Sequence, residues 1–299
     1  MIRRTRCIYI AIALLATFCF FTSAAFVAPD IATAATMMPA PATIQISRER
    51  IATLTGFQVE NLIGVRARGD EAIVVARSGK VLRVTLSNGE TKEDRFPSPL
   101  VDFALGDPEP LGLTQTGAVI SMNTVIGHPG WSAGTFDSCA IDSFGGDALL
   151  SGGKASFFLA KNASVAMPIS SSKFAVLWRD GFLWNLKRGA GNRVWQADIT
   201  DVYGNRMKRM YRFSPEFDPT GLRVGPISSD GDLLLSFYVS SQREIALLGQ
   251  NGRMFWRLPV HDAVCPRDLA FDMQGRLLMI ERDGPTLILN RLIFALPEG

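Results

Sequence analysis

The sequence has few of the residues that usually build metal and catalytic centres. It contains only two histidines, His128 and His261, and four cysteines, of which Cys7 and Cys19 lie in an apolar N-terminal segment. We therefore expect no zinc or copper site rich in histidine. A Ser-His-Asp triad would have to use one of two isolated histidines. No Gly-rich phosphate loop, CxxC pair or haem-attachment motif is present.

A strong charge of either sign is also missing. The formal net charge is +3. This value is too small to indicate a nucleic-acid-binding protein or a strongly cationic protein of the membrane surface. We therefore expect no nucleic-acid partner.

Long apolar runs are absent except near the N-terminus. Residues 7–28 carry no charge and are long enough to span a membrane. Arg3, Arg4 and Arg6 precede this run, and small residues follow it in TSAA and IATAAT. This order is typical of a secretory signal peptide, so we expect an exported protein, periplasmic or secreted. The alternative is an uncleaved segment that anchors the protein in the membrane.

The rest of the chain is predicted to hold one folded domain. Residues 1–35 are assigned to the signal peptide or anchor, residues 36–42 to a Pro-containing linker, and residues 43–299 to the domain. Hydrophobic residues make up 47% of the sequence, enough to build a sizeable core.

The domain is predicted to be all-β. Short apolar runs alternate with Gly, Asn and Asp, and helical periodicity is nearly absent. Hairpin-like turns recur, and Gly tolerates the positive φ that such turns require. These turns are Ser78-Gly79, Thr116-Gly117, Gly152-Gly153, Asp180-Gly181 and Asp283-Gly284. Further turn signals, such as Ser171-Ser172 and Gly191-Asn192, precede and follow them at intervals of about ten residues.

Three turns at this spacing join four antiparallel strands, which make one blade of a β-propeller. We expect a six-bladed β-propeller, with seven blades or a two-sheet β-sandwich as alternatives. A strand over Ala42–Arg48 is predicted to complete the last blade and close the ring, which removes an open sheet edge. Cys139 and Cys265 then lie in different blades, and we expect two free, buried thiols because a disulfide needs Cα atoms within about 7 Å.

The segment from Asn192 to Phe213 is predicted to form an elongated hairpin that rises from the fourth blade. Its second arm carries four cations and a tyrosine: Arg206, Lys208, Arg209, Arg212 and Tyr211. One interpretation is an exposed strand whose Lys and Arg discourage pairing with other sheet edges. The other is a protein-docking surface, because Arg and aromatic residues are favoured at interfaces. In that case Arg206, Arg209 and Tyr211 are the predicted contact residues.

The stretch PRDLAFDMQGRLLMIERDG, residues 266–284, resembles the blade repeat of NHL, gluconolactonase (regucalcin-like) and strictosidine-synthase-like propellers. In that repeat, a Pro and an apolar strand precede Asp-x-x-Gly and a second strand. The corresponding residues here are Pro266, DLAF, Asp272 to Gly275 and RLLMI. PISSDGDLLLSF, residues 226–237, is a looser match. The resemblance covers one blade and implies a propeller fold.

The gluconolactonase-like branch of these propellers binds a divalent metal through an Asp four residues before the turn Asp, and Asp268 occupies that position. The resemblance therefore implies a divalent cation such as calcium at Asp268, held by oxygen ligands and able to activate water against a lactone or ester. Glu60 and Asn185 are the nearest counterparts of two further ligands, but neither lies in the family's local pattern.

The residues themselves also support a purely structural interpretation of the acids in this stretch. Asp272 and Asp283 are predicted to be turn residues. Asp268 is equally consistent with a hydrogen bond or an ion pair to Arg267 or Arg282. Glu281 has no distinctive context.

The sequence indicates a binding or scaffold protein more than an enzyme, and it assigns no catalytic residue. Loops at one face of the propeller are expected to recognise a protein or a small ligand. One alternative is a metal-dependent hydrolase or lactonase of the gluconolactonase type. Another is a periplasmic accessory subunit that docks on an enzyme through the 192–213 hairpin.

Overall fold

The computed structural model describes the greater part of the chain from β1 onwards. The described residues are 45–127, 140–144, 147–152, 155–161, 163–165, 167–170, 176–179, 182–188, 194–201, 206–212, 220–228, 230–239, 241–249, 254–260 and 266–295. They belong to a compact unit that spans Pro41–Gly299. The predicted signal segment, Cys139, Cys265 and both histidines lie outside the described residues.

In these residues the strands form six antiparallel sheets of four strands each. Sheet 1 contains β2 (Leu62–Arg68), β3 (Glu71–Ala76), β4 (Lys80–Thr85) and β5 (Thr91–Arg95). Sheet 2 contains β6 (Leu100–Ala104), β7 (Leu111–Thr114), β8 (Val119–Ile120) and β9 (Val125–Gly127). Sheet 3 contains β10 (Ala140–Phe144), β11 (Asp147–Gly152), β12 (Ala155–Leu159) and β13 (Met167–Ser170).

The remaining sheets follow in the same order. Sheet 4 contains β14 (Val176–Arg179), β15 (Phe182–Arg188), β16 (Val194–Asp201) and β17 (Arg206–Arg212). Sheet 5 contains β18 (Thr220–Ile227), β19 (Leu233–Val239), β20 (Gln242–Leu248) and β21 (Met254–Pro259). Sheet 6 joins β22 (Leu269–Phe271), β23 (Leu277–Asp283) and β24 (Thr286–Ala295) to the N-terminal β1 (Gln45–Thr53). Two 3₁₀ turns, η1 (Val59–Asn61) and η3 (Pro266–Asp268), precede β2 and β22.

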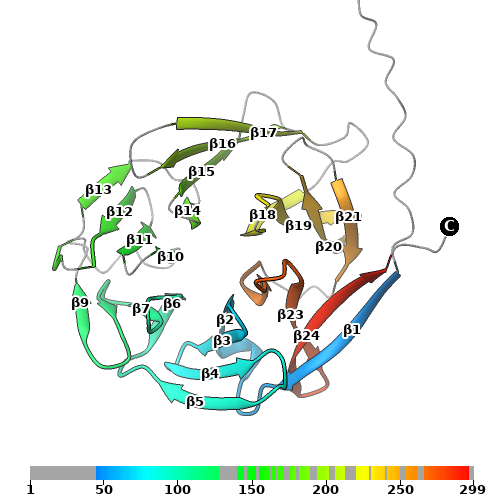
Figure 1. Ribbon diagram of the computed structural model, residues 1–299, viewed down its shortest axis with the longest axis horizontal. Coiled ribbons are helices and arrows are strands. Elements are labelled where there is room, and N and C mark those ends of the chain that lie inside the picture. The colour runs from blue at the N-terminus through cyan, green and yellow to red at the C-terminus, as the bar shows by residue number, and fades with distance from the viewer. Residues whose placement is uncertain are drawn as a thin grey trace, which may run out of the picture. The chain divides into compact units, whose positions relative to one another are not determined.

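In sheets 1 to 5 the first strand, β2, β6, β10, β14 or β18, lies nearest a common centre (Figure 1), and β22 is the inner strand of sheet 6. These inner strands contact one another from sheet to sheet, with β22 against β2, β2 against β6, β6 against β10, β10 against β14, and β18 against β22. Sheets that follow one another around a centre are the defining feature of a propeller. The chain is a β-propeller. The all-β propeller prediction is therefore confirmed, and the sandwich alternative is wrong.

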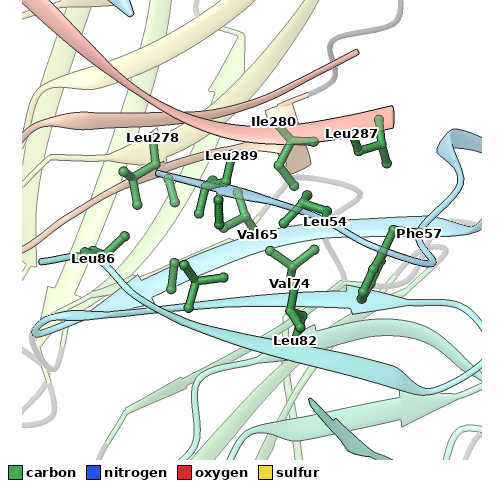
Figure 2. Close-up of a cluster of buried hydrophobic side chains, with 14 of the residues drawn as sticks. Leu54, Phe57, Val65, Val74, Leu82, Leu86, Leu278, Ile280, Leu287 and Leu289 are labelled. Carbon is green, nitrogen blue, oxygen red and sulfur yellow. The ribbon is translucent and has the colours of Figure 1, made fainter. Parts of the chain in front are cut away.

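The hydrophobic core lies between neighbouring sheets. Figure 2 shows the cluster between sheets 6 and 1, where Leu278 and Leu289 face Val65 and Val74. All four side chains are buried, and burying each stabilises the fold by about 1.5–3 kcal/mol. Equivalent clusters occupy the contacts between sheets 1 and 2, 2 and 3, and 5 and 6.

Sheet 6 closes the chain on itself, as the sequence predicts. β1 pairs antiparallel with β24 from Gln45 opposite Ala295 to Thr53 opposite Ile288. Arg48 adds an ion pair to Glu281 on β23, with 3.0 Å between Nε and Oε2. Glu281 also accepts a hydrogen bond from Asn290 of β24 at 2.6 Å. The N-terminal strand is therefore held by both backbone pairing and side chains.

Most predicted turns lie between consecutive strands. Ser78-Gly79 joins β3 to β4 and Asp283-Gly284 joins β23 to β24, and both glycines have positive φ, +84° and +59°. The prediction is wrong in sheet 4. Ser171-Ser172, predicted as a turn within a blade, is outside the described residues, but the strands before and after it, β13 and β14, belong to different sheets. Turn residues mark a reversal of the chain without distinguishing these two kinds of connection.

This correction also changes the interpretation of the 192–213 segment. With Asp180-Gly181 between β14 and β15, the segment contributes β16 and β17, the third and fourth strands of sheet 4. The two strands do pair as a hairpin, as predicted, but they lie within sheet 4 and do not rise from it. β17 is instead the outermost strand of an ordinary four-stranded sheet.

Candidate functional site

Arg66 on β2 and Asp102 on β6 form an ion pair across the contact between two inner strands. The distance from Arg66 Nη2 to Asp102 Oδ1 is 4.0 Å, at the limit of an ion pair. The Asp102 side chain is 1% exposed, whereas that of Arg66 is 30% exposed. Asp102 is thus a buried charge whose counter-charge is partly open to solvent.

Among the described residues, only one of the two carboxylate oxygens of Asp102 accepts a hydrogen bond. Oδ2 accepts a hydrogen bond of 3.1 Å from the backbone N–H of Ile141 on β10, so this residue bridges sheets 2 and 3. Oδ1 is buried and has no hydrogen-bond partner within the described part of the chain. A buried carboxylate oxygen without a hydrogen bond is costly, and such a group in a native structure calls for an explanation.

Arg66 keeps most of its hydrogen-bonding capacity. Its guanidinium lies over the Phe103 ring, 5.4 Å from the centroid, and Nη1 donates to the carbonyl of Val65 at 3.0 Å. Arginine has five donors. By contrast, Arg68 donates to the carbonyls of Gly106 at 2.7 Å and Pro108 at 3.3 Å, which ties sheet 1 to the β6–β7 loop. Arg66 is therefore positioned by a ring and available to an acceptor, while Arg68 is structural.

Asp268, the predicted metal ligand, is the last residue of η3, and its side chain is half-buried. Asp268 already has an interaction partner within the protein. η3 lies against β2, where Gly64 has φ +151° and a Cβ would come within 2.2 Å of the Arg267 carbonyl oxygen. Asp268 is therefore held beside the inner strands of sheets 6 and 1.

Glu60 and Asn185, the further metal ligands that the resemblance implied, do not lie on inner strands as a shared site beside Asp268 would require. Glu60 is exposed on η1, and Asn185 belongs to β15, the second strand of sheet 4. Among the residues that the structure describes, no three His, Cys, Asp or Glu side chains come together as a metal site would require. Divalent-cation binding at Asp268 stays a prediction.

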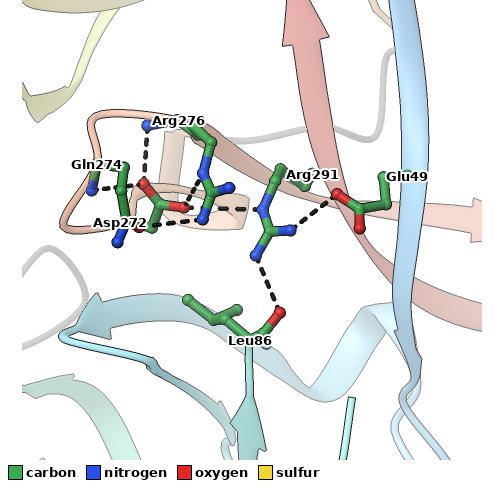
Figure 3. Close-up of polar contacts among 6 residues, drawn as sticks. All are labelled: Glu49, Leu86, Asp272, Gln274, Arg276 and Arg291. Atoms are coloured by element: carbon green, nitrogen blue, oxygen red, sulfur yellow. Dashed lines mark hydrogen bonds and ion pairs between the residues drawn. The ribbon is translucent and has the colours of Figure 1, made fainter. Parts of the chain in front are cut away.

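Asp272 forms a structural network, as the turn interpretation predicts. Its Oδ1 accepts hydrogen bonds from the backbone N–H groups of Gln274 at 3.0 Å and Arg276 at 2.8 Å, and Oδ2 accepts one from Arg276 Nε at 2.7 Å. Figure 3 shows that the network continues through Arg291, which donates to Glu49 and to the Leu86 carbonyl. These bonds fix the β22–β23 turn and join sheet 6 to sheet 1.

The remaining charged residues near this turn have structural partners as well. Glu281 is held by Arg48 and Asn290, and Arg282 donates through Nε to the Gly284 carbonyl at 2.7 Å. Asp283 is exposed at the end of β23. The acidic stretch of residues 266–284 therefore contains no shared acidic site in the structure, and Asp268 alone keeps a functional prediction.

The predicted partner-binding residues Arg206, Arg209 and Tyr211 lie on β17. This strand pairs with β16 along one edge and is the last strand of sheet 4. Figure 1 places it on the periphery, away from the inner strand β14. Arg206 is opposite Thr200, Arg209 opposite Ala197, and Tyr211 opposite Trp195. Positions 209 and 211 belong to one face of the strand and position 206 to the other, because successive residues alternate.

Another outer strand, β5, shows how charges are balanced elsewhere. Its acids are used within sheet 1: Arg83 Nε of β4 donates to Asp94 at 2.9 Å, and Lys80 pairs with Glu93 at 2.9 Å. Burial alone would lower the pKa of Arg83, but hydrogen bonds and charge from Asp94 and Glu71 raise it above its usual value. β17 has no acid among its seven residues.

Sequence reasoning did not identify Arg66 and Asp102. They lie on different sheets and meet only after two sheets pack against each other. The one available signal was an acid inside the apolar run LVDFAL, where a charge is expected to be buried and to need a partner.

Comparison with known proteins supports the fold and no narrower assignment. No protein-family model and no curated protein matches the sequence. The N-terminal domain of Nup159 is 9% identical, with 85% of this chain and 96% of that chain covered and a TM-score of 0.50. The β-propeller domain of Myceliophteria thermophila Cps50 (Swd1) is 12% identical, covers 77% and 83%, and has a TM-score of 0.49. BamB from Moraxella catarrhalis is 13% identical, covers 77% and 85%, and has a TM-score of 0.39.

At these identities the likeness shows the fold alone. The resemblance to the NHL and gluconolactonase-like propellers stays a prediction. In the described residues no helix has the length and apolar character of a membrane span.

Proposed function

We propose that this chain is an exported, six-bladed β-propeller that binds a protein partner and does not itself catalyse a reaction. The six four-stranded sheets support this number of blades. The basic N-terminus followed by a long apolar run supports export. N-terminal sequencing of the mature protein after cell fractionation tests the export. A mature N-terminus between residues 25 and 36 in a soluble exported fraction agrees with a cleaved signal peptide, whereas an intact N-terminus in the cytoplasm contradicts export.

The observation that carries the binding proposal is the position and composition of β17. This strand is the outer edge of sheet 4, so partners can approach it without entering the propeller. It contains four cations and Tyr211 in seven residues. Arg and Tyr are enriched in the central contacts of protein interfaces.

Site-specific photo-cross-linking in the native host tests this proposal. A photoreactive phenylalanine analogue replaces Tyr211, and the control carries the same analogue at Lys92, an exposed position on the outer strand β5. We expect one defined protein adduct from position 211 and none of the same size from position 92. Arg206→Ser together with Arg209→Ser should reduce its yield at least about tenfold, as loss of interface hot spots does. Equal adducts from both positions, or no adduct, would contradict the proposal.

A second candidate function, binding of a small ligand near the centre, rests on Arg66. Its guanidinium is held over Phe103 and makes one hydrogen bond to the described part of the chain, so it can donate to a carboxylate or carbonyl group. Acetate and acetamide are suitable probes, with the arginine side-chain NMR signals as the readout. The Arg66 signals should shift on titration, while those of Arg68, whose donors are bonded to two carbonyls, should not. Equal shifts of both arginines would contradict a specific site.

A further inference from the structure

The outer strands of the six sheets differ sharply in charge. β9 and β13 contain no charged residue, β5 contains two cations and two acids, and the single cation of β21, Arg257, is paired with Glu244 at 2.9 Å. In β1, Arg48 and Glu49 are paired with residues of sheet 6. β17 alone of these described outer strands carries four cations and no acid.

The strand arrangement divides these cations between the two faces. Residues two apart share a face of a strand, so positions 206, 208 and 212 form one row and position 209 belongs to the other. On the side of β16, one acid, Asp198, is directly opposite a cation, Lys208. β16 therefore supplies one direct counter-charge to a row of three cations.

An edge of this kind selects its partner by charge. Like charges directly opposite each other destabilise a strand pair, so a second copy of β17 is disfavoured at this edge. An extended segment with acids at alternate positions is favoured, because each acid then lies opposite a cation. The backbone of such a segment can hydrogen-bond to the edge of β17 that pairs with no other described strand, as in β-strand addition.

We propose that the outer edge of β17 accepts an extended acidic segment of a partner protein as a fifth strand of sheet 4. Acids at alternate positions of that segment lie opposite Arg206, Lys208 and Arg212. This inference rests on the proposed function, because it specifies the chemistry of the partner and the way it binds. The main-chain pairing supplies affinity, and the row of cations supplies selectivity.

Fluorescence anisotropy with short labelled peptides tests the proposal on the full exported chain. The probe alternates Glu and Val. One control replaces each Glu by Gln, and the other keeps the Glu side chains but methylates the amide nitrogens that would face β17. We expect the Glu peptide to bind at least about tenfold more tightly than either control, since the first lacks charge pairs and the second cannot form the backbone ladder.

Substitutions on the protein provide a matched set of variants. The triple variant Arg206→Gln, Lys208→Gln and Arg212→Gln should lose about tenfold in affinity for the Glu peptide. The control, Lys92→Gln with Arg95→Gln, removes the two cations of the outer strand β5 and should bind as the wild type does. Changing the three β17 cations to Glu should instead create affinity for a peptide that alternates Lys and Val. Thermal unfolding of each variant verifies that it is folded.

Three results would overturn the proposal. Equal binding of the N-methylated peptide would show that charge alone attracts the probe. Equal weakening by the β5 control would show that the site is not β17. Binding of single-stranded oligothymidylate with the same affinity and the same loss in the triple variant would identify a polyanion surface instead of a strand-accepting edge.

The peptide and cross-linking experiments can fail separately. If the cross-link at position 211 forms and depends on Arg206 and Arg209 but the peptides do not bind, the partner is real and strand addition is wrong. If the Glu peptide binds as described but no cellular adduct forms, the edge has the proposed chemistry and the proposed partner-binding function is wrong.

Discussion

Asp272 and Arg291 are both buried, with 3.7 Å between Arg291 Nε and Asp272 Oδ2. The pair joins the β22–β23 turn to the last strand of the chain, and Arg291 extends the connection to Glu49 of β1 and the Leu86 carbonyl of sheet 1. The two ends of the propeller are therefore linked by one group of ion pairs and hydrogen bonds.

This linkage predicts the effect of removing the carboxylate charge. Asp272→Asn removes one of the two anions paired with the buried Arg291, leaving Glu49 at 2.8 Å, and weakens the hydrogen bonds to Arg276. Breaking a buried ion pair on one side typically costs about 3–5 kcal/mol, and we expect a decrease of this order in the free energy of unfolding, measured by denaturant titration. Asp283→Asn, at the exposed end of β23, is the control and should change stability by less than about 0.5 kcal/mol. Similar losses in the two variants would show that the network does not stabilise the closure.

Gly64 allows η3 of sheet 6 to pack closely against β2 of sheet 1. Gly64→Ala places a Cβ within 2.2 Å of the Arg267 carbonyl oxygen and also strains a backbone with φ +151°. The control Gly69→Ala has φ +61° but no heavy atom within 4 Å of the new Cβ, so it reports backbone strain alone, about 1–2 kcal/mol. We expect Gly64→Ala to lose about 1–3 kcal/mol more than the control, as overpacking does, when both are compared by thermal unfolding. Equal losses would contradict the close packing of η3 on β2.

Asp102 has one carboxylate oxygen without a hydrogen bond in the described structure. We therefore expect two substitutions at this position to change the free energy of unfolding differently. Asp102→Asn removes a buried charge and can keep the hydrogen bond from Ile141, so stability should be unchanged or increased. Asp102→Ala removes that hydrogen bond and leaves the buried N–H of Ile141 unpaired, which costs about 1–3 kcal/mol. Denaturant titration of both variants measures the difference. A loss in the Asn variant as large as that in the Ala variant would show that the charge itself stabilises the fold.

Much of the architecture could be predicted from local turn chemistry. Gly79 and Gly284 mark tight reversals because few other residues adopt their backbone conformation, and the N-terminal strand was expected to complete the last sheet. The same reasoning failed at Ser171-Ser172, since a connection between sheets uses the same polar residues as a turn within one. Because of that error the hairpin of β16 and β17 was expected to rise from the blade, whereas it forms the third and fourth strands of sheet 4.

The candidate site was harder to predict because it depends on contacts between sheets. Arg66 and Asp102 lie 36 positions apart and meet only through the packing of β2 against β6. Asp272 was correctly assigned to a turn because its partners, Gln274 and Arg276, lie within four residues. Its contact with Arg291 has no local signal. The sequence therefore showed the cationic composition of β17, but its position as an outer edge came from the sheet order.

Hydrogen–deuterium exchange along β17 tests the central claim most directly, because it reports on the backbone that the partner is proposed to pair with. On addition of the acidic peptide of alternating Glu and Val, amides within residues 206–212 should exchange more slowly, with the largest protection at the alternate positions that face the open edge. Amides of β5, residues 91–95, should not change. Unchanged exchange at 206–212 while the peptide is bound, or equal protection of β5, would contradict the account.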